Sequence, residues 1–399
     1  MKNQYRIIAI CYVGWMFDFY DLALFSYVLP SVSKSFFITH QQEAWLLGIG
    51  LGASGVGGIL FGWLADRHGR KTVMVWTIVL YSLGTLLCAA AQNTTMLIIL
   101  RALAGLGLGG EWAVGHALVA ESVDHKARGR AGALLQSGEP VGVALAAVVG
   151  ILLLPQVGWR AVFILSGATA LWAIVVRKAL PESKLWQPPT SQKKVDRSFL
   201  YAPRGIWLMF RAFILATCKL GTYWTCYIWL PKIFATRLHE PIAISVLWIL
   251  TAQAGQLGGM LAFGRLADRI GRRMSFTLYS ALTATALSAL AFEWDVLILH
   301  RPYFWTVMLL LGFGSGCTAG FGVLLAELFP TEVRNFAMGT TYNLARGMQI
   351  FAPIVVLAAM TRWDIAGALS VPLILAILTG IWVWTLPETK DRNLEKIPH

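Results

Sequence analysis

Acidic side chains within long apolar stretches are the residues of this sequence best suited to chemistry. Asp18 and Asp21 stand three positions apart in the first such stretch and share one helix face, while Glu111 stands in a later stretch, ten positions after Arg101. Neighbouring carboxylates that are shielded from water hold protons more readily than carboxylates in solution. These four residues predict a proton-coupling group. The alternative is that one aspartate only pairs with Arg101 and holds two helices together.

Basic side chains stand at a similar depth in the second half of the chain, at Lys219 and Arg346. A buried cation needs a counter-charge or an anionic ligand, and the second half offers no acid at that depth. We therefore expect both residues to bind an organic carboxylate. Further candidates for this substrate site are Glu139, Tyr223, Gln253, Gln256 and Asn343. Simple packing is the alternative for Tyr223, and helix-to-helix hydrogen bonding is the alternative for the two glutamines.

The elements that position these residues are apolar helices. The chain is 57% apolar and 13% charged, which is too hydrophobic for a soluble protein. Runs of about twenty apolar residues can cross a bilayer as helices. The sequence predicts an all-α integral membrane protein with twelve transmembrane helices, at about 7-30, 44-65, 72-91, 96-121, 130-153, 158-179, 206-231, 243-267, 274-292, 303-329, 336-360 and 365-386.

The net charge of +13 reports orientation rather than a nucleic-acid partner. Of the 33 lysines and arginines, 23 lie in segments on the same side of the expected membrane as the N-terminus. Basic loops stay in the cytoplasm, so both termini and the central loop are expected there. The five cysteines fall in or at the expected spans without paired spacing, and they predict neither a disulfide nor a metal site.

An internal repeat divides the chain into two units. Residues 62–71, GWLADRHGRK, recur as GRLADRIGRR at 264–273, and Pro-Glu-Ser-Lys at 181–184 recurs as Pro-Glu-Thr-Lys at 387–390. Repeats in the same order at nearly one spacing indicate two copies of one unit. We expect an N-terminal six-helix bundle at 1-180, a cytoplasmic linker at 181-205, a C-terminal six-helix bundle at 206-388 and a cytoplasmic tail at 389-399.

The repeated loop resembles the signature loop between helices two and three of the major facilitator superfamily. Further motifs resemble the bacterial metabolite and organic-acid proton symporter branch, which includes sialate, aromatic-acid and carboxylate carriers. These motifs are DFYD at 18–21, RALAGLGLGGE at 101–111, ELFPTEVR at 327–334 and YNLAR at 342–346. The resemblance implies two pseudo-symmetric six-helix bundles in a bacterial inner membrane, with substrate bound between them and carried by alternating access.

Under this family topology, the signature loops form a cytoplasmic gate. Asp66 would lie against the start of span eleven, and Asp268 would lie against the start of span five, where the positive ends of helix dipoles favour a carboxylate. The neighbouring charges are expected to pair as Arg70 with Glu121 and Arg272 with Glu327. We expect contacts between the halves here only while the cytoplasmic side is closed. The alternative is that these charges only fix orientation.

Together these features predict a proton-coupled symporter that imports a small organic acid anion, one proton with one monoanion. Its partners would be that acid, protons and membrane lipid, with no nucleic acid and no cofactor, and the protein would be a monomer. The first alternative is a neutral sugar or polyol porter, which would leave Lys219 and Arg346 without a counter-charge. A drug/proton antiporter and a receptor without flux are further alternatives. Nothing in the sequence resembles a metal-binding, phosphate-binding or nucleophile motif, so we expect no enzyme.

Overall fold

The computed structural model describes residues 2–183, 185–186, 198–238, 242–392 and 394, and every regular element within them is helical. Two of the first four long helices begin at a capping side chain. Thr39 closes a capping box with Gln42 at the start of α2, and the side chain of Asn93 accepts the backbone N–H of Met96 in the first turn of α4. The four helices are α1 (Lys2–Phe36), α2 (His40–His68), α3 (Arg70–Cys88) and α4 (Thr94–Ser122).

The remainder of the first half is a broken helical path. A π-helical turn, η2 (Val149–Leu153), interrupts it, and Gly158 turns the chain with φ 77°. Few residues other than glycine adopt that backbone conformation. The helices of this part are η1 (His125–Ala127), α5 (Arg128–Gln136), α6 (Gly138–Val148), α7 (Leu154–Gly167) and α8 (Ala170–Ala179).

The second half repeats the plan. Its first helices are α9 (Ser198–Tyr201), α10 (Pro203–Leu238), α11 (Ile242–Ile270), α12 (Arg272–Phe292) and α13 (Trp294–Leu299). The next path contains α14 (Arg301–Ser315), η3 (Gly316–Ala319) and α15 (Gly320–Leu328). The last contains α16 (Arg334–Met338), the π-helical turn η4 (Gly339–Asn343), α17 (Leu344–Gly347), η5 (Met348–Phe351), α18 (Ala352–Trp382) and η6 (Val383–Thr385).

Within the described residues, nine helical segments are long and apolar enough to cross a bilayer. One of them, His125–Val176, has 52 residues, so a straight helix would be about 78 Å long, more than twice the bilayer core. The turn at Gly158 folds it into two crossings. The two expected spans that are not among the nine coincide with α11 and with the path from α16 into α18. The predicted all-α membrane architecture is confirmed.

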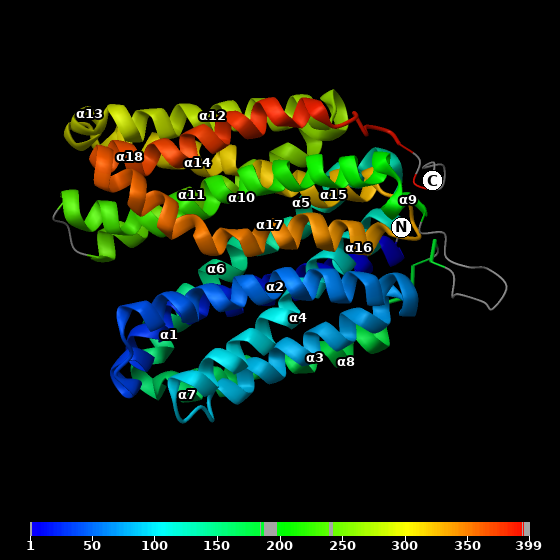
Figure 1. Cartoon of the computed structure of the whole chain (residues 1–399), viewed down its shortest axis with the longest axis horizontal. Coiled ribbons are helices and arrows are strands. Elements are labelled where there is room, and N and C mark those ends of the chain that lie inside the picture. The colour runs from blue at the N-terminus through cyan, green and yellow to red at the C-terminus, as the bar shows by residue number, and fades with distance from the viewer. Residues whose placement is uncertain (1, 184, 187–197, 239–241, 393, 395–399) are drawn as a thin grey trace.

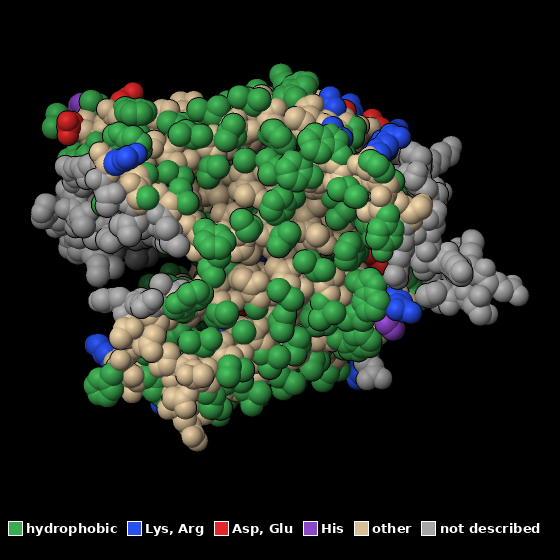
Figure 2. Space-filling view, in the orientation of Figure 1, with side chains coloured by type: hydrophobic (Ala, Val, Ile, Leu, Met, Phe, Trp, Pro, Cys, Tyr) green, Lys and Arg blue, Asp and Glu red, His purple; other side chains and the backbone are tan. Residues whose placement is uncertain are grey.

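Figure 1 shows two layers of helices, with α1–α4, α7 and α8 in the lower one and α10–α14 with α18 in the upper one. Several contacts join the two halves; among them, α5 packs on α11, and α16 and α17 pack on α2. Both chain termini lie at one end of the molecule, which we call the terminal end (Figure 1). Figure 2 shows hydrophobic side chains across the middle of this face and charged ones toward its two ends.

The domain boundaries stay a prediction. About half of the expected linker at 181-205 and part of the expected tail at 389-399 lie outside the described residues.

Candidate functional site

Asp18 of α1 and Glu111 of α4 form a carboxylate pair between the helices. Their residues are 0% and 2% exposed, and the two carboxylates are neighbours. Gly14, one turn before Asp18, makes room for the pair, because a Cβ at this position would lie 2.0 Å from Glu111 Oε1. None of the four carboxylate oxygens accepts a hydrogen bond from any part of the chain that the structure describes. The pair therefore has the surroundings of a proton-binding group.

Asp21 does not join this pair, contrary to the expected Asp18–Asp21 unit. Its carboxylate lies 2.9 Å from Arg101 Nη1 and also accepts the hydroxyl of Thr85. The Arg101 guanidinium further lies over the Phe25 ring, 4.5 Å from its centroid. All partners belong to the first half, so this ion pair ties α1 to α3 and α4. The structure thus matches the alternative interpretation for Asp21, which pairs with Arg101 rather than with Asp18.

Arg346 of α17 reaches across from the second half toward α1. The residue is 1% exposed, and neither Nη1 nor Nη2 has a hydrogen-bond partner among the described residues. The guanidinium lies over two α1 rings, 5.9 Å from the Trp15 centroid and 5.4 Å from the Phe19 centroid. Asp18 and Glu139 are the acids that act on it electrostatically. Arg346 thus faces the carboxylate pair with both terminal nitrogens free to bind an anion.

Lys219 of α10 supplies a second buried cation. It is 2% exposed, and its Nζ has no hydrogen-bond partner in the described part of the chain. The positive charge of Lys219 acts electrostatically on Glu139 and Cys317. The expected grouping of Lys219 with Arg346 agrees with this geometry, because both cations act on Glu139. The expected Tyr223 and Gln253 are also buried, on α10 and α11, and Tyr223 is electrostatically coupled to Arg346.

Glu139 of α6 links the two halves at this depth. Its Oε2 accepts Gln136 Nε2 at 2.9 Å, and its Oε1 accepts Gln256 Nε2 of α11 at 3.1 Å. Gln136 in turn accepts the indole N–H of Trp112 at 3.3 Å. The Trp112 ring stacks on Tyr342 of η4, with centroids 3.6 Å apart and planes 7° apart. The chain of contacts begins and ends in the second half and passes through the first.

Asn343 of η4 makes another contact between the halves, since its Nδ2 donates to Gly109 O of α4 at 2.8 Å. Sequence reasoning named Asn343 and Gln256 but missed Trp15, Phe19 and Gln136. The sequence did contain a signal for Trp15 and Phe19, because these two aromatic residues are four apart on a helix and lie on either side of Asp18. In this conformation the halves are joined at the site by contacts such as Asn343–Gly109, Glu139–Gln256 and Trp112–Tyr342.

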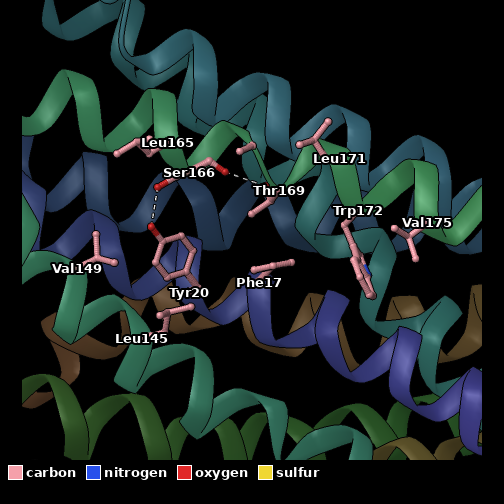
Figure 3. Close-up of a pocket in the computed structure, with 11 residues that line it drawn as sticks. Phe17, Tyr20, Leu145, Val149, Leu165, Ser166, Thr169, Leu171, Trp172 and Val175 are labelled. Atoms are coloured by element: carbon pink, nitrogen blue, oxygen red, sulfur yellow. Dashed lines mark hydrogen bonds between the residues drawn. The ribbon is translucent and has the colours of Figure 1, made fainter.

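A surface pocket of about 370 Å³ lies elsewhere, between α1, α6, α7 and α8 (Figure 3). Tyr20 donates or accepts one hydrogen bond with Ser166 Oγ at 2.8 Å, and most of the other lining side chains are apolar. Leu171 at its rim is 64% exposed, so the pocket opens on the apolar outer surface. None of the sequence-predicted site residues lines it.

At the terminal end, a second polar cluster joins the halves, and we call it the terminal-end network. Asp66, near the end of α2, accepts the backbone N–H groups of Asn335 and Phe336 at 3.2 and 2.9 Å at the start of α16. Asp268, near the end of α11, accepts those of Gly129 and Arg130 at 2.9 and 3.1 Å at the start of α5. Both contacts agree with the expected positions of these aspartates.

The arginine–glutamate pairs of this network form as expected but within each half. Arg70 lies 3.3 Å from Glu121, and Arg272 lies 2.9 Å from Glu327. Among the described residues, two ion pairs cross between the halves: Glu121 lies 2.6 Å from Arg334, and Asp268 lies 3.5 Å from Arg130. The expectation that the Arg70 and Arg272 pairs bridge the halves is therefore replaced by bridges through Asp66, Asp268 and Glu121.

The repeated Pro-Glu-Ser/Thr-Lys motif caps a helix in each half. Glu182 accepts the backbone N–H of Arg70 at 2.9 Å, and Glu388 accepts that of Arg272 at 2.9 Å. In each case the preceding glycine, Gly69 or Gly271, has positive φ. Burial by itself raises the pKa of the Glu388 carboxyl, but the backbone N–H groups that it accepts hold that pKa below its usual value.

Comparisons with known proteins agree with this architecture. The family model described as Major Facilitator Superfamily matches residues 11–340 and 243–399. A probable 4-methylmuconolactone transporter of Cupriavidus pinatubonensis is 31% identical over 99% of this chain and 93% of its own. The niacin transporter NiaP of Acinetobacter baylyi is 27% identical over 99% and 97%. The solved proton:xylose symporter XylE superposes with a TM-score of 0.80 at 18% identity, covering 99% and 98%. The chain, with its two helical halves and repeated signature loop, belongs to the major facilitator superfamily.

Proposed function

We propose that this transporter is a proton-coupled symporter that imports a small organic acid as a monoanion. The observation that carries the proposal is the buried site between the halves, where two cations have no hydrogen-bond partners among the described residues: Arg346 lies near Asp18 of a carboxylate pair without donors, and Lys219 lies near Glu139. Polar groups left unsatisfied in hydrocarbon are costly, so a bound anion and a transferred proton are the natural complement of this site. A neutral sugar would leave both cations without a counter-charge.

In this proposal, Arg346 and Lys219 bind the substrate carboxylate. A guanidinium can bind both oxygens of a carboxylate, and its position over the Trp15 and Phe19 rings places flat apolar surfaces beside that carboxylate. An acid with a ring next to its carboxylate fits these surfaces. Relatives named for niacin and 4-methylmuconolactone, both of them ring compounds, support this choice.

The Asp18–Glu111 pair takes the coupled proton. Two neighbouring buried carboxylates do not both ionise readily, so they share one proton and accept a second when a negative substrate arrives nearby. One proton and one monoanion carry no net charge together, so the pH gradient rather than the membrane potential would drive uptake.

Alternating access follows from the contacts between the halves. The terminal-end network would close the cytoplasmic side, with both termini in the cytoplasm and the protein in a bacterial inner membrane. The network contacts described above correspond to the cytoplasm-closed state. Opening toward the cytoplasm would break the Asp66, Asp268 and Glu121 bridges and also the Glu139–Gln256 and Trp112–Tyr342 contacts. The domain limits named from the sequence describe the two bodies that would rock.

Uptake into proteoliposomes tests the proposal. Initial rates of labelled nicotinate entry, corrected for protein-free liposomes, should rise with an inward proton gradient and fall in the presence of other ring monocarboxylates such as benzoate. Nicotinamide, which is neutral, and xylose should compete weakly or not at all. Asp18→Asn should abolish stimulation by the gradient, and Arg346→Gln should abolish uptake. Transport of sugars, or of no monocarboxylate in the panel, would contradict the proposal.

A further inference from the structure

Glu139 differs from the other acids of the buried site, because each of its oxygens accepts an amide N–H. The assignment of Gln136 is fixed by Trp112, whose indole N–H can only donate, at 3.3 Å to Gln136 Oε1. The Gln136 NH₂ group therefore points at Glu139 Oε2 at 2.9 Å, and Gln256 donates to Oε1 at 3.1 Å. Donors on both oxygens favour the ionised carboxylate. Glu139 is thus a fixed negative charge, unlike the Asp18–Glu111 pair.

The other groups around Glu139 complete the charge count. Lys219 and Arg346 are positive, and Tyr342 is the remaining titratable group that acts on it. Tyrosine and cysteine side chains are neutral near pH 7. His116, on the next turn of α4, points its Nδ1 at Trp112 O at 3.0 Å and leaves Nε2 without a partner in the described structure, as a neutral imidazole does. The charges of Asp21 and Arg101 cancel each other, because these two side chains form an ion pair.

With one proton on the Asp18–Glu111 pair, the empty site is neutral, because two cations face Glu139 and one remaining negative charge. A second proton leaves one positive charge, which one monoanion neutralises. A proton without substrate, or substrate without a proton, leaves the buried site charged, and a buried charge without a partner opposes the closed intermediate through which the halves must pass.

We propose that Glu139 sets the fixed charge of the site, and that this charge restricts the substrate to a monoanion carried with one proton. This inference rests on the symport function proposed above and adds the residue that determines the charge class of the substrate. Removing the negative charge would raise the fixed charge by one. A monoanion would then neutralise the site without a second proton, and a dianion would neutralise it with one.

The number of protons taken up per substrate bound tests the inference. Full-length protein in weakly buffered detergent is mixed with nicotinate in the presence of a pH-indicator dye, and occupancy is measured with labelled nicotinate. The wild-type protein should take up about one proton per nicotinate, and Glu139→Asp should do the same. Glu139→Gln should take up close to none and should bind the dianion quinolinate more tightly than the wild type does, by tenfold or more.

A second substitution that restores the net charge of the site provides a further test. Lys219→Gln lowers the fixed charge by one, so Glu139→Gln with Lys219→Gln should return the proton number to about one, even at reduced affinity. Lys219→Gln alone should bind nicotinate less tightly than the double variant, because the Asp18–Glu111 pair can add only one proton and the occupied site would stay negative. This comparison keeps the inference testable if Glu139→Gln alone does not fold. Folding is checked by nicotinate exchange in liposomes. An unchanged proton number in Glu139→Gln would overturn the inference and leave the symport proposal standing, whereas a wild-type protein that binds nicotinate without any proton would contradict the symport proposal itself.

Discussion

Arg346 is the residue on which substrate recognition depends most directly. Its two terminal nitrogens are buried and without hydrogen bonds in the described structure, between the Trp15 and Phe19 rings. Arg346→Lys keeps the charge but loses the planar fork that can bind both carboxylate oxygens. The KM for nicotinate uptake should therefore rise about tenfold or more, as expected for the loss of one charge-assisted hydrogen bond. The exposed Arg160→Gln is the matched control and should leave KM unchanged. Equal KM values in both variants would remove Arg346 from the binding site.

Individual residues also mark the limit of what the sequence predicts. Apolar context around Asp18, Glu111, Lys219 and Arg346 was enough to place them at mid-depth, because charge in hydrocarbon is rare without a reason. It could not show that Asp21 turns toward Arg101 while Asp18 turns toward Glu111. Residues three apart on a helix share a face yet differ in direction by about 60°, and the neighbouring helices decide the partner.

At the scale of elements, the close approach of α2 to α16 depends on Gly62. A Cβ at this position would lie 2.5 Å from Asn335 O, so Gly62→Ala should force the helices apart at the terminal end and destabilise the closed state. The control is Gly258→Ala in α11, where no atom lies within 4 Å of the added Cβ. Spin labels at Arg67→Cys and Glu332→Cys, both exposed sites, should report a longer distance for Gly62→Ala only. The five native cysteines are all buried.

The contacts that Asp66 and Asp268 make with the other half should affect the same equilibrium between the closed and the open form of the terminal end. Asp66→Asn replaces a carboxylate that accepts the N–H groups of Asn335 and Phe336 with an amide that accepts less well. A carboxylate at a helix start contributes about 1 to 2 kcal/mol in a partly buried setting, so the open population should rise about five- to thirtyfold. The same spin-label pair measures it. Asp124→Asn changes an exposed acid at the same end and should have no effect. If the two variants behave alike, the aspartate contacts do not stabilise the closed form, and these charges only fix the orientation of the protein in the membrane.

Glu388, which accepts backbone N–H groups at the start of α12, makes a pH-dependent contribution to the stability of the folded protein. Because the pKa of Glu388 is lower in the folded protein, its stabilisation is present above about pH 4 and is lost as the pH falls through the folded value. Glu388→Gln should therefore lower thermal stability by about 1 kcal/mol at pH 7, as loss of a helix cap does. The difference from the wild-type melting temperature should disappear in acid. A difference that persists well below pH 3 would show that the carboxylate charge does not act.

Element boundaries were predictable where composition changes sharply, as between the span at 44-65 and the basic loop after it. The π-helical turns η2 and η4 were not, because they lie inside the expected spans at 130-153 and 336-360. The break near Gly158 was expected between the spans at 130-153 and 158-179, but the positive φ of this glycine was not predictable. The caps made by Glu182 and Glu388 were hidden for another reason, since their repeated motif was visible but its partner helices are far away in the chain.

At the scale of the whole molecule, the repeat at 62–71 and 264–273 was sufficient to predict two similar halves, because one unit copied in sequence folds twice in the same way. The contacts between the halves at the site were not predictable. They include Trp112 on Tyr342 and Glu139 on Gln256, which join residues more than a hundred positions apart. Only the packing of the halves brings these pairs together.

Proton entry during substrate uptake tests the central claim most directly. Proteoliposomes loaded with a pH-sensitive dye and held at zero membrane potential are given external nicotinate, with protein-free liposomes as the baseline. The account predicts that wild-type protein acidifies the interior faster than this baseline, at about one proton per nicotinate, and that Asp18→Asn loses the extra acidification. Nicotinate uptake by the wild-type protein without any acidification above the baseline would contradict it.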